Sequence, residues 1–229
     1  MRRATEQRQL PGLDATRSGA KIELRDGGWI RYWPSFLALA EAARLFAELR
    51  TGIGWAQFRN QLWTFPRLTA FVADQGIVYR YSGVEHAGSG WPEALCEVRR
   101  RVEQLAGAEF DGVLLNLYRD GNDSMGRHAD AERVLGPNPL VASVSLGAVR
   151  SFVLRHRASK EKINLDLADG SLLLMGGTLQ HHWVHELPRT KEPVGERINL
   201  TFRSFVGELR KGASSRARRR SQRRPGLRR

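Results

Sequence analysis

The sequence has one cysteine, no long apolar run and no internal repeat. A single cysteine, Cys96, excludes an internal disulfide framework and fits a reducing compartment. No stretch approaches the roughly 20 apolar residues that a helix needs to cross a bilayer, and the first residues lack the apolar core of a signal peptide. These absences exclude disulfide-rich secreted and membrane-spanning classes, and we expect a soluble cytosolic protein with no membrane partner.

Acidic residues are scarce near the C-terminus, so the positive charge is unevenly distributed. The formal net charge is +13, and the segment 208–229, with ten Lys and Arg against one acidic residue, carries +9 of it. We expect residues 209–229 to form a disordered Arg-rich tail, because they have almost nothing to bury. Such a tail favours polyanions through counterion release, without reading sequence. The alternatives are a solubilising or incidental tail and, more weakly, binding to a membrane surface.

The length of 229 residues fits one domain. We expect a loose lead-in over residues 1–28 and a domain over residues 29–208. Apolar residues at helical spacing predict helices over 34–49 and 91–105, with a Gly-rich turn over 82–90. Short runs rich in Val, Ile, Leu and Phe predict strands over residues 112–118, 140–146, 150–155, 163–167, 171–175, 181–186 and 197–205. This order indicates an α+β fold, with a double-stranded β-helix (jelly-roll) core buttressed by N-terminal helices.

His128 and Asp130 stand at H-x-D spacing, and a cluster of three histidines lies later in the chain, at His181, His182 and His185. Two histidines and one carboxylate can occupy one face of a ferrous ion and leave the other face open, as in non-haem Fe(II) oxygenases. On the strand predicted there, His181 and His185 would share one face and His182 the other. Spacing alone therefore does not choose the second histidine ligand.

The segment 197–203 has one polar and one apolar face if it is a strand. The polar face carries Arg197, Asn199, Thr201 and Arg203, because alternate side chains of a strand share a face. Two arginines pointing into a barrel are costly unless an anion lies beside them, and arginine suits bidentate carboxylate binding. The pattern predicts an anion site, and the alternative is an edge strand with a solvated Arg face.

Five short segments follow one another in a recognisable order. They are Asn116-Leu-Tyr118, His128-Ala-Asp130, Ser143-Val-Ser-Leu-Gly147, His182-Trp-Val-His185-Glu-Leu-Pro188 and Arg197-Ile-Asn-Leu-Thr-Phe-Arg203. In combination they resemble the AlkB family of Fe(II)/2-oxoglutarate dioxygenases. The resemblance runs from about Pro66 to Phe205, and the segments 66–83 and 152–157 look closer to the animal homologues that repair duplex DNA.

The resemblance implies a metal set and a cosubstrate set. The family's distal histidine stands shortly before a proline-containing turn, so His128, Asp130 and His185 are the implied ligands of Fe(2+). The implied contacts of 2-oxoglutarate are Asn116, Tyr118, Arg197, Asn199, Thr201 and Arg203. Arg197 is the candidate for the distal carboxylate. O2 is the second cosubstrate.

The resemblance also implies a substrate and residues that bind it. The expected reaction is oxidative demethylation of alkylated nucleobases, such as 1-methyladenine and 3-methylcytosine, in DNA, carried out by a monomer in the nucleoid region of a bacterium or the nucleus of a eukaryote. The candidate substrate residues are Tyr79, Tyr81, Glu132 and Trp63 near the base, and Arg67, Arg155 and Arg157 along the DNA backbone. The alternatives are RNA or a methylated protein as substrate, a catalytically silent nucleic-acid-binding module, and a simple cupin-like metalloprotein.

Overall fold

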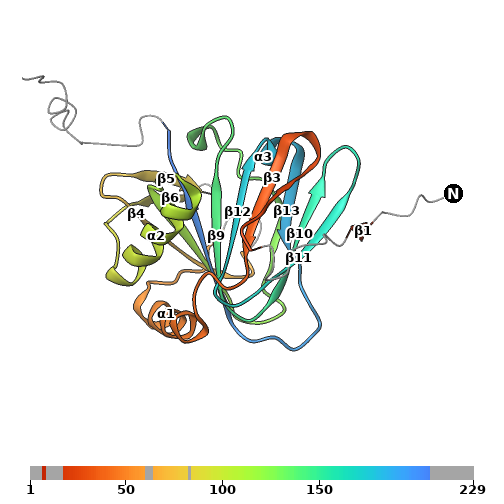
Figure 1. Cartoon of the computed structure of the whole chain (residues 1–229). Coiled ribbons are helices and arrows are strands. Elements are labelled where there is room, and N and C mark those ends of the chain that lie inside the picture. Colours follow the sequence, from red (N-terminus) through yellow and green to blue (C-terminus); the bar gives the residue numbers. More distant parts are fainter. Residues whose placement is uncertain (1–6, 9–17, 60–63, 82–83, 207–229) are drawn as a thin grey trace, which may run out of the picture.

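The computed structural model describes residues 7–8, 18–59, 64–81 and 84–206 (Figure 1). A seven-stranded sheet has the order β2 (Lys21–Glu23), β3 (Gly28–Trp33), β12 (Ser171–Gly177), β9 (Val141–Gly147), β14 (Arg197–Arg203), β7 (Gly112–Tyr118) and β4 (Leu68–Ala73). A five-stranded sheet has the order β1 (Gln7–Arg8), β11 (Lys162–Leu167), β10 (Arg150–His156), β13 (Trp183–Leu187) and β8 (Met125–His128). The hairpin of β5 (Val78–Tyr81) and β6 (Val84–Ala87) forms a third, small sheet.

The two large sheets face each other and enclose a core. Buried residues of β3, β9 and β12 pack against residues of β10, β11 and β13, among them Leu154 and Trp183. The helices α1 (Leu39–Gly52) and α2 (Glu93–Ala106) cover the outer face of the seven-stranded sheet, with Leu45 and Val98 in a second core cluster (Figure 1). Two facing sheets buttressed by these helices are the predicted double-stranded β-helix.

The predicted helices begin later than their sequence pattern indicates. The first was expected from residue 34, but the helix begins at Leu39, because the backbone N–H of Leu37 donates to the carbonyl of Gly170 and Phe36 O accepts from Arg101. Both bonds hold this turn and bend on distant parts of the chain. Tertiary contacts therefore override the local helical spacing.

Three further expectations are wrong. The strand expected over 181–186 begins at Trp183, and the histidines before it lie on the short helix α3 (Leu179–His182), so the alternation used for them does not apply. The Gly-rich segment expected as a turn contains β6. The lead-in expected to be loose up to residue 28 contains β2, which pairs with β3 and extends the sheet.

The tail at 209–229 lies outside the described residues. In the described part of the chain, no helix is both long enough and apolar enough to span a bilayer.

Candidate metal centre and cosubstrate pocket

Three metal-ligand side chains converge where β8 and β13 pair. His128 ends β8 and is in register with His185 of β13, and Asp130 follows two residues later. The Nε2 atoms of the two histidines lie 3.1 Å apart, and Nε2 of His185 lies 3.5 Å from Oδ2 of Asp130. Ligand nitrogens bind a first-row metal at about 2.0–2.1 Å, so two ligands at right angles lie about 3 Å apart. The spacing of the three groups fits one metal ion.

The protonation of these groups also suits a metal. Burial opposes ionisation of Asp130, but Arg203 and the two imidazoles outweigh burial and hold the pKa of Asp130 well below its usual range. Burial and the neighbouring His128 lower the pKa of His185 to about 3, so its imidazole is neutral. Nδ1 of His128 donates to the carbonyl of Gly126 at 2.9 Å, which leaves Nε2 with a free lone pair. Among the described residues, the buried Oδ2 of Asp130 has no hydrogen-bond partner. This donor set fits Fe(II).

Gln180 of α3 positions the H-x-D loop, and sequence reasoning missed it. Its Oε1 accepts the backbone N–H of Asp130 at 2.9 Å, and the side chain is almost completely buried. The two residues are 50 positions apart, so no local pattern in the sequence signals the contact. Gln180 thus links α3 to the loop that presents the carboxylate.

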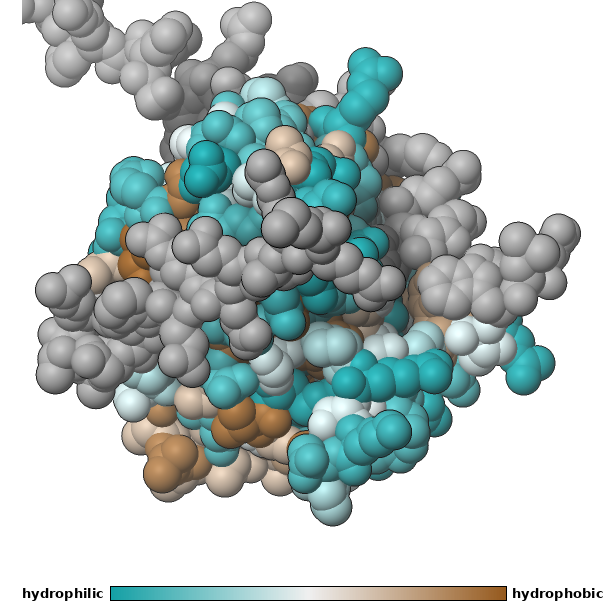
Figure 2. Space-filling model, turned by 90° about the vertical axis from the view of Figure 1, so that its right-hand side faces the viewer, coloured by the Kyte–Doolittle hydropathy of each residue, from teal (hydrophilic) through white to brown (hydrophobic). Residues whose placement is uncertain are grey.

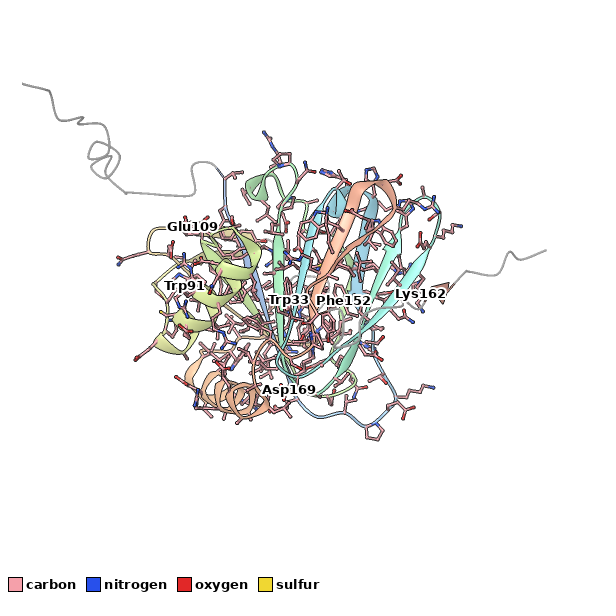
Figure 3. The ribbon with its side chains drawn as sticks, viewed as in Figure 1. Trp33, Trp91, Glu109, Phe152, Lys162 and Asp169 are labelled. Atoms are coloured by element: carbon pink, nitrogen blue, oxygen red, sulfur yellow. The ribbon has the colours of Figure 1, made fainter. Side chains whose placement is uncertain are left out.

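The polar face of β14 lies in the same pocket as the three ligands. β14 is an interior strand between β9 and β7, and Arg197 and Arg203 are 2% and 4% exposed, which excludes a solvated Arg face. The pocket has a cavity volume of about 40 Å³ and is partly open to solvent. Its polar lining comprises the residues predicted to contact metal and cosubstrate: Asn116, Tyr118, His128, Asp130, His185, Arg197, Asn199, Thr201 and Arg203. Phe152 adds an apolar wall near the middle of the molecule, 5.3 Å from the ring of His185 (Figure 3).

Arg197 is the buried cation of this pocket. Burial lowers the pKa of Arg197 to about 10, and its Nε has no hydrogen-bond partner among the described residues. Nη2 donates to Ser145 Oγ at 2.9 Å and to Asn199 Oδ1 at 2.7 Å, and the guanidinium lies 5.3 Å from the Tyr118 ring. Asn199 in turn donates to Thr201 Oγ1 at 2.8 Å. The network orients Arg197 and, within the described residues, leaves its charge without an anionic partner, which is what a dicarboxylate site requires.

Arg203 has a partner within the protein in addition to the cosubstrate contact predicted for it. Its Nε donates to Oδ1 of Asp130 at 3.1 Å and its Nη2 donates to the same oxygen. The pair is buried, with each side chain at most 5% exposed. Arg203 therefore holds the carboxylate and directs Oδ2 toward the two histidines. Because Arg203 also lines the pocket, its contact with 2-oxoglutarate stays a prediction.

The arginines expected along a DNA backbone lie in three different environments. Arg67 is only 3% exposed, and its Nε donates to Asn116 Oδ1 at 2.8 Å, so the expectation that it contacts DNA is wrong for this structure. Arg155 is partly buried and forms an ion pair with Glu186 at 2.7 Å. Arg157 alone of the three is exposed. Sequence could not separate them because burial depends on neighbours far along the chain.

The expected base-binding residues are only partly described. The ring of Tyr79 is completely buried between Phe71 and Phe205, at 5.5 and 4.9 Å, so it offers no free face for stacking. Its hydroxyl donates to Glu132 Oε1 at 3.2 Å, while the buried Oε2 of Glu132 has no hydrogen-bond partner among the described residues. Tyr79 therefore positions Glu132. Trp63 and the side chain of Tyr81 lie outside the described part of the chain.

A second set of ligand-type side chains, Asp26, His156 and His182, lies away from this pocket. The backbone N–H of Ser159 donates to Nδ1 of His156 at 3.0 Å, so the neutral imidazole carries its proton on Nε2. That proton is donated to Asp26 at 2.8 Å. Both ring nitrogens are engaged, and we interpret this set as a structural contact that includes His182.

Comparisons with known proteins agree with this geometry. A family model described as the 2OG-Fe(II) oxygenase superfamily matches residues 30–203. The DNA oxidative demethylase ALKBH2 of Mus musculus is 38% identical over 73% of this chain and 76% of that protein. The alpha-ketoglutarate-dependent dioxygenase alkB homolog 3 of Bos taurus is 34% identical over 77% of this chain and 66% of that protein. A solved structure of OsALKBH1 covers 80% of this chain and 99% of that one at 17% identity with a TM-score of 0.58, which shows a shared fold.

The matched range extends from β3 to the last residue of β14, so it contains every residue of the metal and cosubstrate pocket. The sequence identity to the AlkB homologues extends over most of the same domain. With the fold, the donor set and both sequence comparisons in agreement, this chain belongs to the AlkB family of the 2OG-Fe(II) oxygenase superfamily, whose members use Fe(II), 2-oxoglutarate and O2.

Proposed function

We propose that this chain removes alkyl groups from nucleobases in DNA by oxidation, with Fe(II) held by His128, Asp130 and His185. The observation that carries the proposal is the convergence of these three ligands and the buried Arg197 in one pocket. A binding module has no need of a metal triad beside an unpaired buried cation. The choice of DNA rests on the relatives that are named DNA oxidative demethylases.

Iron and 2-oxoglutarate would supply the oxidising chemistry when bound: O2 is the oxidant, one of its atoms enters succinate as the keto acid loses CO2, and the other hydroxylates an N-methyl group that is lost as formaldehyde. The chain's own residues set the geometry. Arg203 holds Oδ1 of Asp130, so that Oδ2 remains for the metal, and the carbonyl of Gly126 accepts from Nδ1 of His128, so that Nε2 is the ring nitrogen that faces the metal site. Arg197 would bind the distal carboxylate of the cosubstrate with Tyr118 beside it.

The loop that follows Asp130 carries an acceptor that suits an exocyclic amine. Glu132 stands two residues after Asp130, and its buried Oε2 has no hydrogen-bond partner in the described structure. A carboxylate oxygen accepts the amino protons of cytosine or adenine. A base leaves the DNA stack at a cost of roughly a few kcal/mol to reach such a pocket. Glu132 would recover part of that cost.

The exposed side of the five-stranded sheet carries basic residues that could contact phosphates. Figure 2 shows the side on which β11 lies, and outside the grey residues its upper part is mostly hydrophilic. Lys162 lies at this side of the molecule (Figure 3), and Arg157 and Lys160 are exposed in the turn before it. Contacts of this kind position nucleic acid without reading its sequence.

Formaldehyde release tests the proposed function directly. The protein, Fe(II), ascorbate and 2-oxoglutarate are incubated with single- and double-stranded oligonucleotides that carry 1-methyladenine or 3-methylcytosine, and with matched RNA. We expect formaldehyde and succinate in equal amounts from at least one DNA substrate, and none without 2-oxoglutarate. Turnover of RNA or of a methylated protein alone would replace DNA as the substrate, and absence of 2-oxoglutarate turnover with every substrate would refute the enzyme.

Truncation tests the Arg-rich tail. We expect a chain that ends at Glu208 to bind DNA more weakly and with a flatter dependence on salt, because fewer basic side chains displace counterions from the DNA. Turnover of a short oligonucleotide should stay close to that of the full chain, since the pocket lies within residues 116–203. The measurement is a salt series of binding constants by fluorescence anisotropy. An unchanged salt slope would contradict a tethering role.

A further inference from the structure

We infer that Arg67 is a positioning residue for 2-oxoglutarate, which acts by fixing the orientation of the Asn116 side-chain amide. Arg67 immediately precedes β4, and Asn116 lies on the neighbouring strand β7. Nε of Arg67 donates to Oδ1 of Asn116 at 2.8 Å, and Nη1 donates to the carbonyl of Ser124 at 3.2 Å. The contact joins two buried side chains, 3% and 1% exposed.

The chemistry of the two groups decides which end of the amide faces Arg67. A guanidinium has only donors, whereas an amide has an oxygen that accepts and a nitrogen that donates. A flipped amide would set Nδ2 against the guanidinium, donor against donor, in a buried site where an unsatisfied polar group costs about 1–3 kcal/mol. Arg67 therefore holds Oδ1 and leaves Nδ2 of Asn116 free to donate.

Nδ2 of Asn116 is available to donate a hydrogen bond to a ligand in the pocket. Asn116 lines it together with Tyr118 and Arg197, while Arg67 lies behind Asn116 and is not among the described lining residues. An anion such as a carboxylate of 2-oxoglutarate needs donors, and a carbonyl oxygen at this place would repel it. The orientation that Arg67 imposes is thus the one that favours the cosubstrate.

The guanidinium is itself held from several sides. It lies 5.1 Å from the ring of Phe65, and its bond to Ser124 ties it to the loop before β8, the strand that ends in His128. These contacts come from the described segments 64–81 and 84–206 and leave the guanidinium little freedom to turn away. Arg67 therefore connects the edge strand β4 to the cosubstrate side of the pocket.

The experiment measures binding of 2-oxoglutarate by calorimetry to Mn(II)-loaded protein, without turnover. We expect Arg67→Met to raise the dissociation constant about tenfold, in line with the loss of one oriented hydrogen bond to a charged group. Arg67→Lys keeps a donor for Oδ1 and should recover part of the affinity. In an Asn116→Ala background, Arg67→Met should cause no further loss, because the residue through which it acts is gone.

A matched control variant separates a loss of 2-oxoglutarate affinity from a general loss of protein stability. Arg99→Met also removes a partly buried guanidinium that lies over an aromatic ring, here 4.4 Å from Trp91 on α2, far from the pocket lining. It should lower stability and leave 2-oxoglutarate affinity unchanged. The inference rests on the proposed function only for the identity of the ligand: if the unaltered protein does not bind 2-oxoglutarate, the proposed function fails.

Other outcomes would overturn the role of Arg67 alone. These are unchanged affinity in Arg67→Met, a further tenfold loss in the Asn116→Ala background, or an effect confined to the KM for DNA. The last result would restore Arg67 as a nucleic-acid contact. A rise in the KM for 2-oxoglutarate at nearly constant kcat and constant KM for DNA would support positioning.

Discussion

Replacing Asp130 by alanine should abolish metal binding and also lower the free energy of unfolding of the metal-free protein by about 3–5 kcal/mol. The first effect follows because Asp130 supplies the one carboxylate of the triad, and its Oδ1 is already held by Arg203. The second follows because Arg203, 4% exposed, would lose the carboxylate to which it donates and remain as a buried, uncompensated charge. Metal titration and urea denaturation of the metal-free protein measure the two effects separately.

His128→Ala is the matched control for Asp130→Ala. His128 is only half-buried. Among the described residues it forms no salt bridge, and it contacts charged groups only within the triad. Its loss should therefore cost less than about 1 kcal/mol of stability. It should nevertheless abolish metal-dependent turnover of 2-oxoglutarate. Metal-dependent turnover that survives in His128→Ala would remove this histidine from the metal set. Wild-type stability in metal-free Asp130→Ala would show that the Arg203 contact contributes nothing to the fold.

Arg197→Met should raise the KM for 2-oxoglutarate roughly 100-fold or more, because a bidentate, charge-assisted contact with the distal carboxylate is lost. The same change should leave the metal-free protein equally stable or make it more stable, since a buried charge without a counter-ion is replaced by an apolar side chain of similar size. Burial lowers the pKa of Arg197 to about 10, which reports the same cost of keeping this cation inside the protein. Loss of Arg197 is thus expected to leave stability unchanged or higher, whereas Asp130→Ala, which breaks the ion pair with Arg203, is expected to lower it.

Thermal unfolding with added cosubstrate tests whether Arg197 binds 2-oxoglutarate. At a concentration of 100 times its dissociation constant, 2-oxoglutarate should stabilise the unaltered protein by about 2.7 kcal/mol, and it should not stabilise Arg197→Met at the same concentration. Arg197→Lys keeps the charge but loses the planar fork, so it should recover little affinity. If methionine at this position leaves the stabilisation intact, the distal carboxylate lies elsewhere in the pocket.

The strands that carry the cosubstrate face were the most predictable part of the fold. The segment 112–118 was predicted with the bounds it has in the structure, and 197–203 forms the strand whose polar face was expected to point inward. Both succeed because alternation of side chains is a local property of an extended backbone. The start of α1 was missed because hydrogen bonds to distant residues decide it. The short helix α3 and the strand β6, which pairs with β5, were also missed.

The chain alone contained the donor types of the metal site, the alternation that places two arginines on one strand face, and the order of motifs that marks the family. These are properties of residue type and short-range spacing. Only the tertiary structure decided that His185 faces His128, that Arg203 holds Asp130 while Arg197 stays unpaired, and that Arg67 lies behind Asn116. Each of these outcomes joins residues tens of positions apart, and burial within the two facing sheets determines which charges are paired and which remain available to a ligand.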